Sequence, residues 1–298
     1  MAPFHVPVLS RQVLEHIAVR PEKVYLDCTA GLGGHVGQVA QQLTTGHVIA
    51  NDRDAESLEL AKENTRQWAD RIWYHHGPFS RLGEALAVNG GRKVSGLLAD
   101  LGVSRYQLTE AERGFSLQSD GPLDMRMDRG VGQSAAEILN YSSERELADL
   151  IYQLGEERRA RRITRALIRA RPLRSTGHVA RVIEEAVPRM GKLHPATLTF
   201  MAIRRAVNDE VEELESLLRS LPRLVESGGR CVILTFMSLE DRQVKQGFQR
   251  LAKEGKARIL TKHVVTPDDE EIRANPLSRS AKLRCIEMVS EEAEPVGD

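Results

Sequence analysis

Apolar and polar positions over the first hundred residues alternate between two periods. Short apolar runs of strand length are followed by stretches in which apolar residues recur every three or four positions. The predicted strands span residues 24–28, 47–51, 72–75 and 94–100, and the predicted helices span residues 9–18, 35–43, 55–68 and 80–88. Strands that alternate with helices form a parallel sheet, and ligands bind at the carboxyl ends of such strands. The pattern therefore predicts an α/β fold.

The alternation stops near residue 109. Residues 111–133 have no period and carry many glycines, aspartates and arginines, which is typical of a functional or disordered loop. The helices predicted after this loop span residues 134–139, 143–154, 156–171 and 176–187. A block of helices without strands indicates a helical insertion in the α/β domain.

The sheet pattern returns after the helices. The predicted elements are a long helix over residues 195–218, a helix over 239–253, and strands at 229–236, 257–261 and 282–289. We therefore predict that residues 1–108 and 197–298 form one domain and that residues 109–196 form the inserted helical domain.

Composition and charge restrict the function only weakly. Lys plus Arg and Asp plus Glu both number 42 in the 298 residues, so a nucleic-acid partner would need a local basic patch. The three cysteines lie in apolar runs, and no spacing of His or Cys is typical of a metal site. The sequence has no membrane-spanning run and no signal-peptide pattern at its start, so we expect a cytoplasmic protein. The zero net charge is compatible with a homodimer.

The stretch from Val24 to His35 predicts a nucleoside site. A strand that ends at Asp27 is followed by a turn with glycines at positions 31, 33 and 34 and then by a helix. The next strand is followed by Asp52, at the spacing that nucleotide-binding units use to hold a ribose. Asp27 would repel a pyrophosphate but attract a sulfonium or ammonium group, and the dinucleotide glycine spacing is not met. S-adenosylmethionine is therefore favoured over a dinucleotide.

Asp100 ends the fourth strand and has two interpretations. A strand-end aspartate commonly accepts hydrogen bonds within a turn. Alternatively, its carboxylate faces the methyl group that is transferred, where it would orient an exocyclic amine and accept its proton. Gly102 allows a close approach here, so we favour the second interpretation.

Two basic or mixed-charge segments lie in the inserted block. Arginines recur on one face of the helix predicted at 156–171, namely Arg158, Arg162, Arg165 and Arg169. Such a row is either a solvated face or a phosphate-binding surface, and its single sign of charge favours phosphate binding. In the preceding loop Asp124, Arg126 and Asp128 alternate, which fits a solvated turn or an active-site loop equally well.

These motifs together resemble a known family, the RsmH (MraW) methyltransferases. The stretches that carry the resemblance are His5–Leu9, Gly31–His35, Asp52–Asp54, His76–Ser80, Asp100–Ser104, Glu112–Ser116, Asp120–Asp128, Gly155–Glu157, His194–Thr197, Ser238–Arg242, and Asn275–Pro276 with Arg279–Ser280. They run in order along nearly the whole chain, and the Asp120–Asp128 stretch is long and unusual. The resemblance implies a Rossmann-like class I methyltransferase sheet with an inserted all-helical domain that binds RNA.

The resemblance also implies an activity, a cofactor and a partner. The family methylates N4 of a cytidine in the decoding region of 16S rRNA of the small ribosomal subunit, and its cofactor is S-adenosyl-L-methionine. The residues that look like its cofactor-binding set are Gly33, Gly34, His35, Asp52, Phe79, Asp100 and Gln107. On this basis we expect Asp100 and Asp124 to accept the amine protons. Arg126 and the four helix arginines would bind the substrate.

The chain departs from the usual family residues at several polar positions, which are Arg105, Thr109, Leu198, Met201 and Met237. These departures leave two alternatives open. One is a non-catalytic ribosome-assembly factor that binds RNA with a methyltransferase fold. The other is a DNA amino-methyltransferase, although those enzymes typically carry a Pro-Pro-aromatic run where this chain has Leu101-Gly-Val103.

Overall fold

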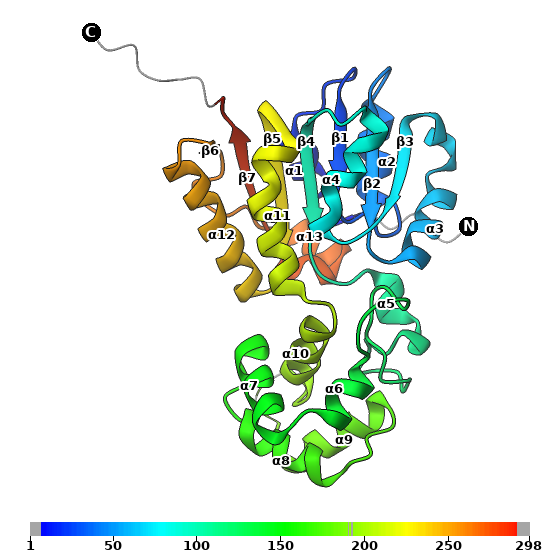
Figure 1. The fold of residues 1–298 in the computed structure, drawn as a ribbon, viewed down its shortest axis with the longest axis vertical. Coiled ribbons are helices and arrows are strands. Elements are labelled where there is room, and N and C mark those ends of the chain that lie inside the picture. Colours follow the sequence, from blue (N-terminus) through cyan, green and yellow to red (C-terminus); the bar gives the residue numbers. More distant parts are fainter. Residues whose placement is uncertain (1–6, 190, 192, 291–298) are drawn as a thin grey trace. The chain divides into compact units, whose positions relative to one another are not determined.

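The computed structural model describes residues 7–189, 191 and 193–290, so the first part of the His5–Leu9 motif lies outside it. The chain forms two compact units, which are shown in Figure 1. The first unit combines Met1–Gly102 with Glu212–Asp298, and the second is Val103–Val211. No helix among the described residues is long and apolar enough to cross a membrane.

The first unit contains one sheet of seven strands in the order β3-β2-β1-β4-β5-β7-β6. The strands are β1 (Val24–Asp27), β2 (His47–Asp52), β3 (Ile72–His76), β4 (Val94–Asp100), β5 (Val225–Thr235), β6 (Ala257–Ile259) and β7 (Lys282–Met288). The first five strands are parallel, as the alternation with helices predicts. β7 is antiparallel to both of its neighbours, which the sequence pattern did not predict.

Helices cover both faces of this sheet, so its central strands are apolar on both sides. Leu97 and Ala99 of β4 share one core with α4 (Leu82–Ala85), α11 (Glu210–Leu224) and α12 (Ser238–Lys253). The intervening Leu98 belongs to the core on the other face, with α1 (Ser10–Ile17), α2 (Gly34–Gln42) and α3 (Ala55–Asn64). The remaining helices of this unit are α13 (Asp269–Ala274) and the short 3-10 helices Arg66–Arg71, Phe79–Arg81, Leu86–Asn89 and Pro276–Ser280. The layered α/β arrangement confirms the predicted fold class.

The second unit has helices around a core of its own. They are α5 (Arg105–Thr109), the 3-10 helix Ala111–Arg113, α6 (Ala135–Tyr141), α7 (Glu144–Gly155), α8 (Ala160–Arg169), α9 (Thr176–Ala186) and α10 (Thr197–Val207). The irregular loop contributes Phe115, Leu123, Met125 and Met127 to this core. The loop is therefore packed into the unit by its apolar side chains.

The single helix predicted over residues 195–218 is wrong. The structure has two helices there, α10 and α11, separated at Asn208 and Asp209. Asp209 has a φ of 49°, in the left-handed region that a helix cannot continue through. The Arg204 side chain makes a bidentate ion pair with Glu210, both bonds 2.7 Å long, and this pair fixes the break.

The boundary between the two units after the helical insertion also differs from the predicted one. Residues 197–211 belong to the helical unit, whereas the sequence pattern grouped 197 onward with the sheet. The helix predicted over 156–171 is shorter as well, because α8 begins at Ala160. Glu156 is left-handed with a φ of 52°, and the buried Glu157 accepts hydrogen bonds from Arg159 before the helix starts. Arg158 consequently lies in a turn and outside the helical arginine row.

Candidate active site and RNA-binding surface

Three aspartates gather at the carboxyl edge of the parallel strands. Asp27, Asp52 and Asp100 end β1, β2 and β4, and β1 lies between the other two strands. Burial raises the pKa of Asp27 to about 6, and the neighbouring charge of His35 partly offsets this effect. Burial also raises the pKa of Asp52 to about 6, against the hydrogen bonds that its carboxylate accepts from Asp54 and Gly31. The edge thus concentrates carboxylates that favour a cation.

The glycine turn is fixed directly to Asp52. The backbone N–H of Gly31 donates to Asp52 Oδ2 over 2.7 Å. Gly31 and Gly33 have φ values of 52° and 87°, which favour glycine. A Cβ on Gly33 would lie 2.7 Å from Thr65 Cγ2, so this position also needs the absence of a side chain. Gly34 follows as the first residue of α2, and a Cβ at this position would lie 3.3 Å from Pro7 Cβ.

Thr29 connects Asp27 with Asp100, and sequence reasoning missed this role. Its hydroxyl accepts from the backbone N–H of Asp100 over 2.7 Å and donates to Asp27 Oδ1 over 3.3 Å. The signal was a hydroxyl residue two positions after a strand-end aspartate, a spacing that commonly gives a local hydrogen bond.

His35 lies beside Asp100, with 3.7 Å between its Nε2 and Asp100 Oδ2. Only 6% of the His35 side chain is exposed, and Asp27 is 3% exposed. Among the described residues, both ring nitrogens of His35, Asp27 Oδ2 and Asp100 Oδ1 have no hydrogen-bond partner. Buried polar atoms are rarely left without partners, so these atoms indicate that a polar ligand binds at this edge.

Asn51 positions the turn that carries Phe79, and it too was missed. Its Nδ2 donates to the carbonyl oxygens of Cys28 and Gly77, over 3.0 and 3.1 Å. Gly77 in turn donates its N–H to the carbonyl of Asp52. Phe79 begins the 3-10 helix just after this turn and is partly buried against the core. The available sequence signal was an asparagine within an apolar strand, because the amide of a buried asparagine must be hydrogen-bonded.

The remaining predicted cofactor residue, Gln107, belongs to the second unit. Gln107 is buried in α5, where its side-chain oxygen accepts from Ser104 N and its N–H donates to Ser104 Oγ. This reciprocal capping box fixes the start of the helix. The structure thus gives Gln107 a capping role within its unit.

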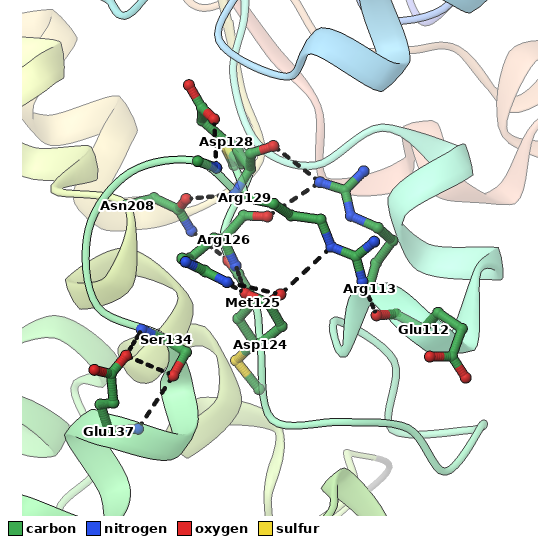
Figure 2. A network of polar contacts seen from close by, with 12 residues as sticks. Glu112, Arg113, Asp124, Met125, Arg126, Asp128, Arg129, Ser134, Glu137 and Asn208 are labelled. Atoms are coloured by element: carbon green, nitrogen blue, oxygen red, sulfur yellow. Dashed lines mark hydrogen bonds and ion pairs between the residues drawn. The ribbon is translucent and has the colours of Figure 1, made fainter.

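Asp124 is held by two arginines in the loop of residues 111–133. Arg126 Nε donates to Asp124 Oδ1 over 2.7 Å, and Arg129 Nε lies 3.4 Å from Oδ2 (Figure 2). Burial raises the pKa of Asp124, but the hydrogen bonds from Arg126 outweigh it and leave that pKa below its ordinary value. Asp124 is therefore an ionised hydrogen-bond acceptor and a weak proton acceptor.

Arg162, Arg165 and Arg169 line an open hollow of ≈ 400 Å³ together with Glu185 of α9. All three arginines are exposed, and none of them forms an ion pair with a carboxylate in the part of the chain that the structure describes. Arg158 is exposed in the turn before the helix. Elsewhere in the same unit Arg159 and Arg204 are paired with glutamates. Unpaired arginines on one helix face are typical of a surface that binds anions.

Among the described residues no group of three or more His, Cys, Asp or Glu side chains could hold a metal ion. The unpartnered atoms of Asp27, His35 and Asp100 fit instead a nucleoside ligand that carries a positive charge and polar groups.

The sheet order, the glycine turn and the acidic edge define a class I S-adenosylmethionine-dependent methyltransferase. The chain belongs to the MraW methylase family, whose sequence profile matches residues 2–289. It is 61% identical to the Ribosomal RNA small subunit methyltransferase H of Solibacter usitatus (strain Ellin6076), over 95% of this chain and 99% of that protein. The proteins of the same name from Koribacter versatilis (strain Ellin345) and Acidobacterium capsulatum are 46% and 45% identical, over 94% and 95% of this chain and 92% and 98% of theirs. S-adenosylmethionine is therefore the cofactor.

Proposed function

We propose that this chain transfers a methyl group from S-adenosylmethionine to N4 of a cytidine in the decoding region of 16S rRNA. Its partner would be the small ribosomal subunit in the cytoplasm. The name of its relatives supports a ribosomal RNA substrate. The single observation that carries the proposal is the sheet edge where Asp27, His35 and Asp100 have polar atoms without hydrogen-bond partners among the residues that the structure describes.

The cofactor supplies an electrophilic methyl group on a sulfonium sulfur. The ionised Asp27 attracts the positive charge of this ligand, and Asp52 accepts hydrogen bonds from its ribose hydroxyls. The turn at Gly33 and Gly34 lets the ligand approach the backbone, because these positions have no side chain. His35, Phe79 and Gln107 complete the proposed cofactor set.

Asp100 is the proposed proton acceptor. Its Oδ1 has no partner among the described residues, and its backbone is fixed by Thr29. Asp100 would accept the proton that the cytidine N4 loses as the methyl carbon–sulfur bond breaks, the methyl group passes to the nitrogen and S-adenosylhomocysteine leaves. Asp124 orients the same amine by accepting a hydrogen bond, since its lowered pKa makes it a poor base.

The α8 arginines are the proposed contacts to the RNA backbone. An arginine that binds RNA phosphates needs no carboxylate partner within the protein. Arg162, Arg165 and Arg169 have no such partner among the described residues. Arg158 and Arg126 would add substrate contacts from outside this row. Binding through phosphates positions an RNA without reading its sequence.

Transfer of a tritiated methyl group tests the proposal. Small subunits from cells that lack this protein are the substrate, and DNA is offered in parallel. Label in one cytidine of 16S rRNA supports the proposed reaction. Label only in DNA would support a DNA amino-methyltransferase, and saturable RNA binding without label would support a non-catalytic assembly factor.

A further inference from the structure

We propose that Asn208 and Arg113 are positioning residues that hold the Asp124–Arg126 segment in the conformation required for methyl transfer. This inference rests on the proposed function for the role of the segment itself. Both side chains are directed at the backbone of the loop, as Figure 2 shows. Neither residue belongs to the cofactor set or to the arginine row.

The segment needs external support because its backbone is strained. Met125 has a φ of 60°, a conformation that is unfavourable for any residue with a Cβ. Its side chain is only 1% exposed, so it cannot leave the core without a loss of packing. Such a residue keeps its conformation only where the surroundings impose it, and strain of this kind is common at functional sites.

Asn208 imposes the conformation from the end of α10. Its Oδ1 accepts from Met127 N over 2.8 Å, and its Nδ2 donates to the carbonyl of Met125 over 2.7 Å. One amide thus binds an N–H and a C=O of the loop, as a neighbouring β-strand would. The same Nδ2 donates to the carbonyl of Arg204 over 2.8 Å, which anchors Asn208 to its helix. Asn208 is 1% exposed, so these bonds are shielded from water.

Arg113 reaches the same segment. Its Nη2 donates to the carbonyl oxygens of Arg126 and Met127, over 3.0 and 2.9 Å. Its own carbonyl accepts from Met125 N over 3.1 Å. The guanidinium lies over the rings of Tyr106 and Phe115, 6.0 and 5.8 Å from their centroids, and these rings favour the buried charge.

The helix break after α10 has an explanation in this contact. The backbone N–H of Asn208 still donates to the carbonyl of Arg204 over 3.1 Å, so Asn208 is the C-cap of α10. The left-handed Asp209 and the Arg204–Glu210 ion pair end the helix at this residue, whose side-chain amide binds the loop. The break therefore supplies a hydrogen-bonding partner to a strained segment that has no strand beside it.

Asn208→Asp tests the inference, because it keeps the size of the side chain and removes the donor. The carboxylate of this variant faces the carbonyls of Met125 and Arg204, and repulsion should displace the loop. We expect at least a tenfold loss of kcat/KM for small subunits at pH 8, with the affinity for S-adenosylmethionine unchanged. Protonation restores a donor, so the ratio of variant to native activity should rise as the pH falls toward 6.

Ser143→Ala is the matched control, because it removes a helix cap in the same unit without touching the loop. It should lower the melting temperature and leave kcat/KM within twofold. Arg113→Lys is the second variant, which keeps the charge but removes the planar fork of donors; it should reduce kcat/KM at every pH. If Asn208→Asp does not fold, a normal kcat/KM in Arg113→Lys overturns the inference.

The NMR signals of ¹³C-methyl methionine report the loop without any activity. Asn208→Asp should shift the signals of Met125 and Met127 and leave that of Met288 in the sheet unit unchanged. A shift of these signals with native kinetics, or an activity ratio that does not change with pH, would overturn the positioning role. Failure of the native protein to methylate RNA would instead refute the proposed function, while the methionine signals would still show whether Asn208 holds the loop.

Discussion

The carboxyl edge of the sheet and the loop of residues 111–133 position their acidic groups by different means. At the edge, parallel strands stop at Asp27, Asp52 and Asp100, and the backbone ladder brings these three positions together. In the loop no ladder exists, and the side chains of Arg113 and Asn208 bind the backbone in its place. Positions set by a ladder follow from local sequence, whereas positions set by side chains depend on residues far along the chain.

Loss of the proposed proton acceptor at the sheet edge, Asp100, should reduce turnover more than any other change. Asp100→Asn keeps the shape of the side chain but cannot accept a proton, so we expect kcat at saturating cofactor to fall by about a hundredfold or more. Single-turnover methyl transfer to small subunits measures this change. The control is Asp70→Asn, since Asp70 is 74% exposed and lies outside the site. Native turnover in Asp100→Asn would contradict the assigned role.

Neutralising the arginine row should weaken RNA binding without affecting the edge. Replacing Arg162, Arg165 and Arg169 with Gln should lower RNA affinity by roughly tenfold to a hundredfold at physiological salt. The slope of log affinity against log salt concentration should fall by about one for each arginine that no longer binds a phosphate. Filter binding over a salt series measures both, with cofactor affinity as the internal control. The triple Lys variant keeps the charge, so a similar loss in that variant would refute a mainly electrostatic role.

Loss of the proposed contact between Asp52 and the ribose should weaken cofactor binding by a similar or smaller factor. Asp52→Asn loses the charged acceptor that also holds Gly31 N, so we expect the dissociation constant of S-adenosylmethionine to rise by about tenfold. Isothermal titration calorimetry measures this constant directly. RNA affinity should stay native. A variant that binds RNA poorly but the cofactor normally would reverse the division of roles between the two regions.

The last prediction concerns pH, whose effect on cofactor binding is small near neutrality and grows below pH 6. Asp27 and Asp52 have pKa values of about 6 in the free protein, so a cationic ligand must displace protons from them below that pH. Cofactor affinity should therefore be constant above about pH 7 and fall by up to about tenfold for each pH unit and carboxyl below 6. The same raised values mean that these carboxyls reduce fold stability as the pH rises from 3.8 to about 6. Cofactor affinity that does not change between pH 5 and pH 8 would contradict the placement of the cation beside Asp27.

Much of the sheet unit could be predicted because each strand carries its own signal. Apolar runs with an acid at the end placed Asp27, Asp52 and Asp100 at one edge, and the structure brings them together there. The antiparallel direction of β7 was not predictable, because an apolar run has no direction. Thr29 and Asn51 were missed because their partners belong to other strands or turns.

For residues 111–133 the sequence predicted an irregular segment but not its conformation. Its alternating charges did not distinguish a solvated turn from an active-site segment, since both have the same composition. The pairing of Asp124 with Arg126 and Arg129 depends on the conformation at Met125, which has no local sequence signal. The helix break next to Asn208 was missed because the apolar spacing continues through it.

The identity of the methylated atom tests the proposed reaction most directly. Small subunits that lack the modification are incubated with the native chain and deuterated S-adenosylmethionine, and the 16S rRNA is digested to nucleosides for mass spectrometry. The proposed function predicts that the deuterated methyl group appears on cytidine and co-elutes with an N4-methylcytidine standard. A deuterated methyl group on another atom or another base, or none at all on the RNA, would contradict it.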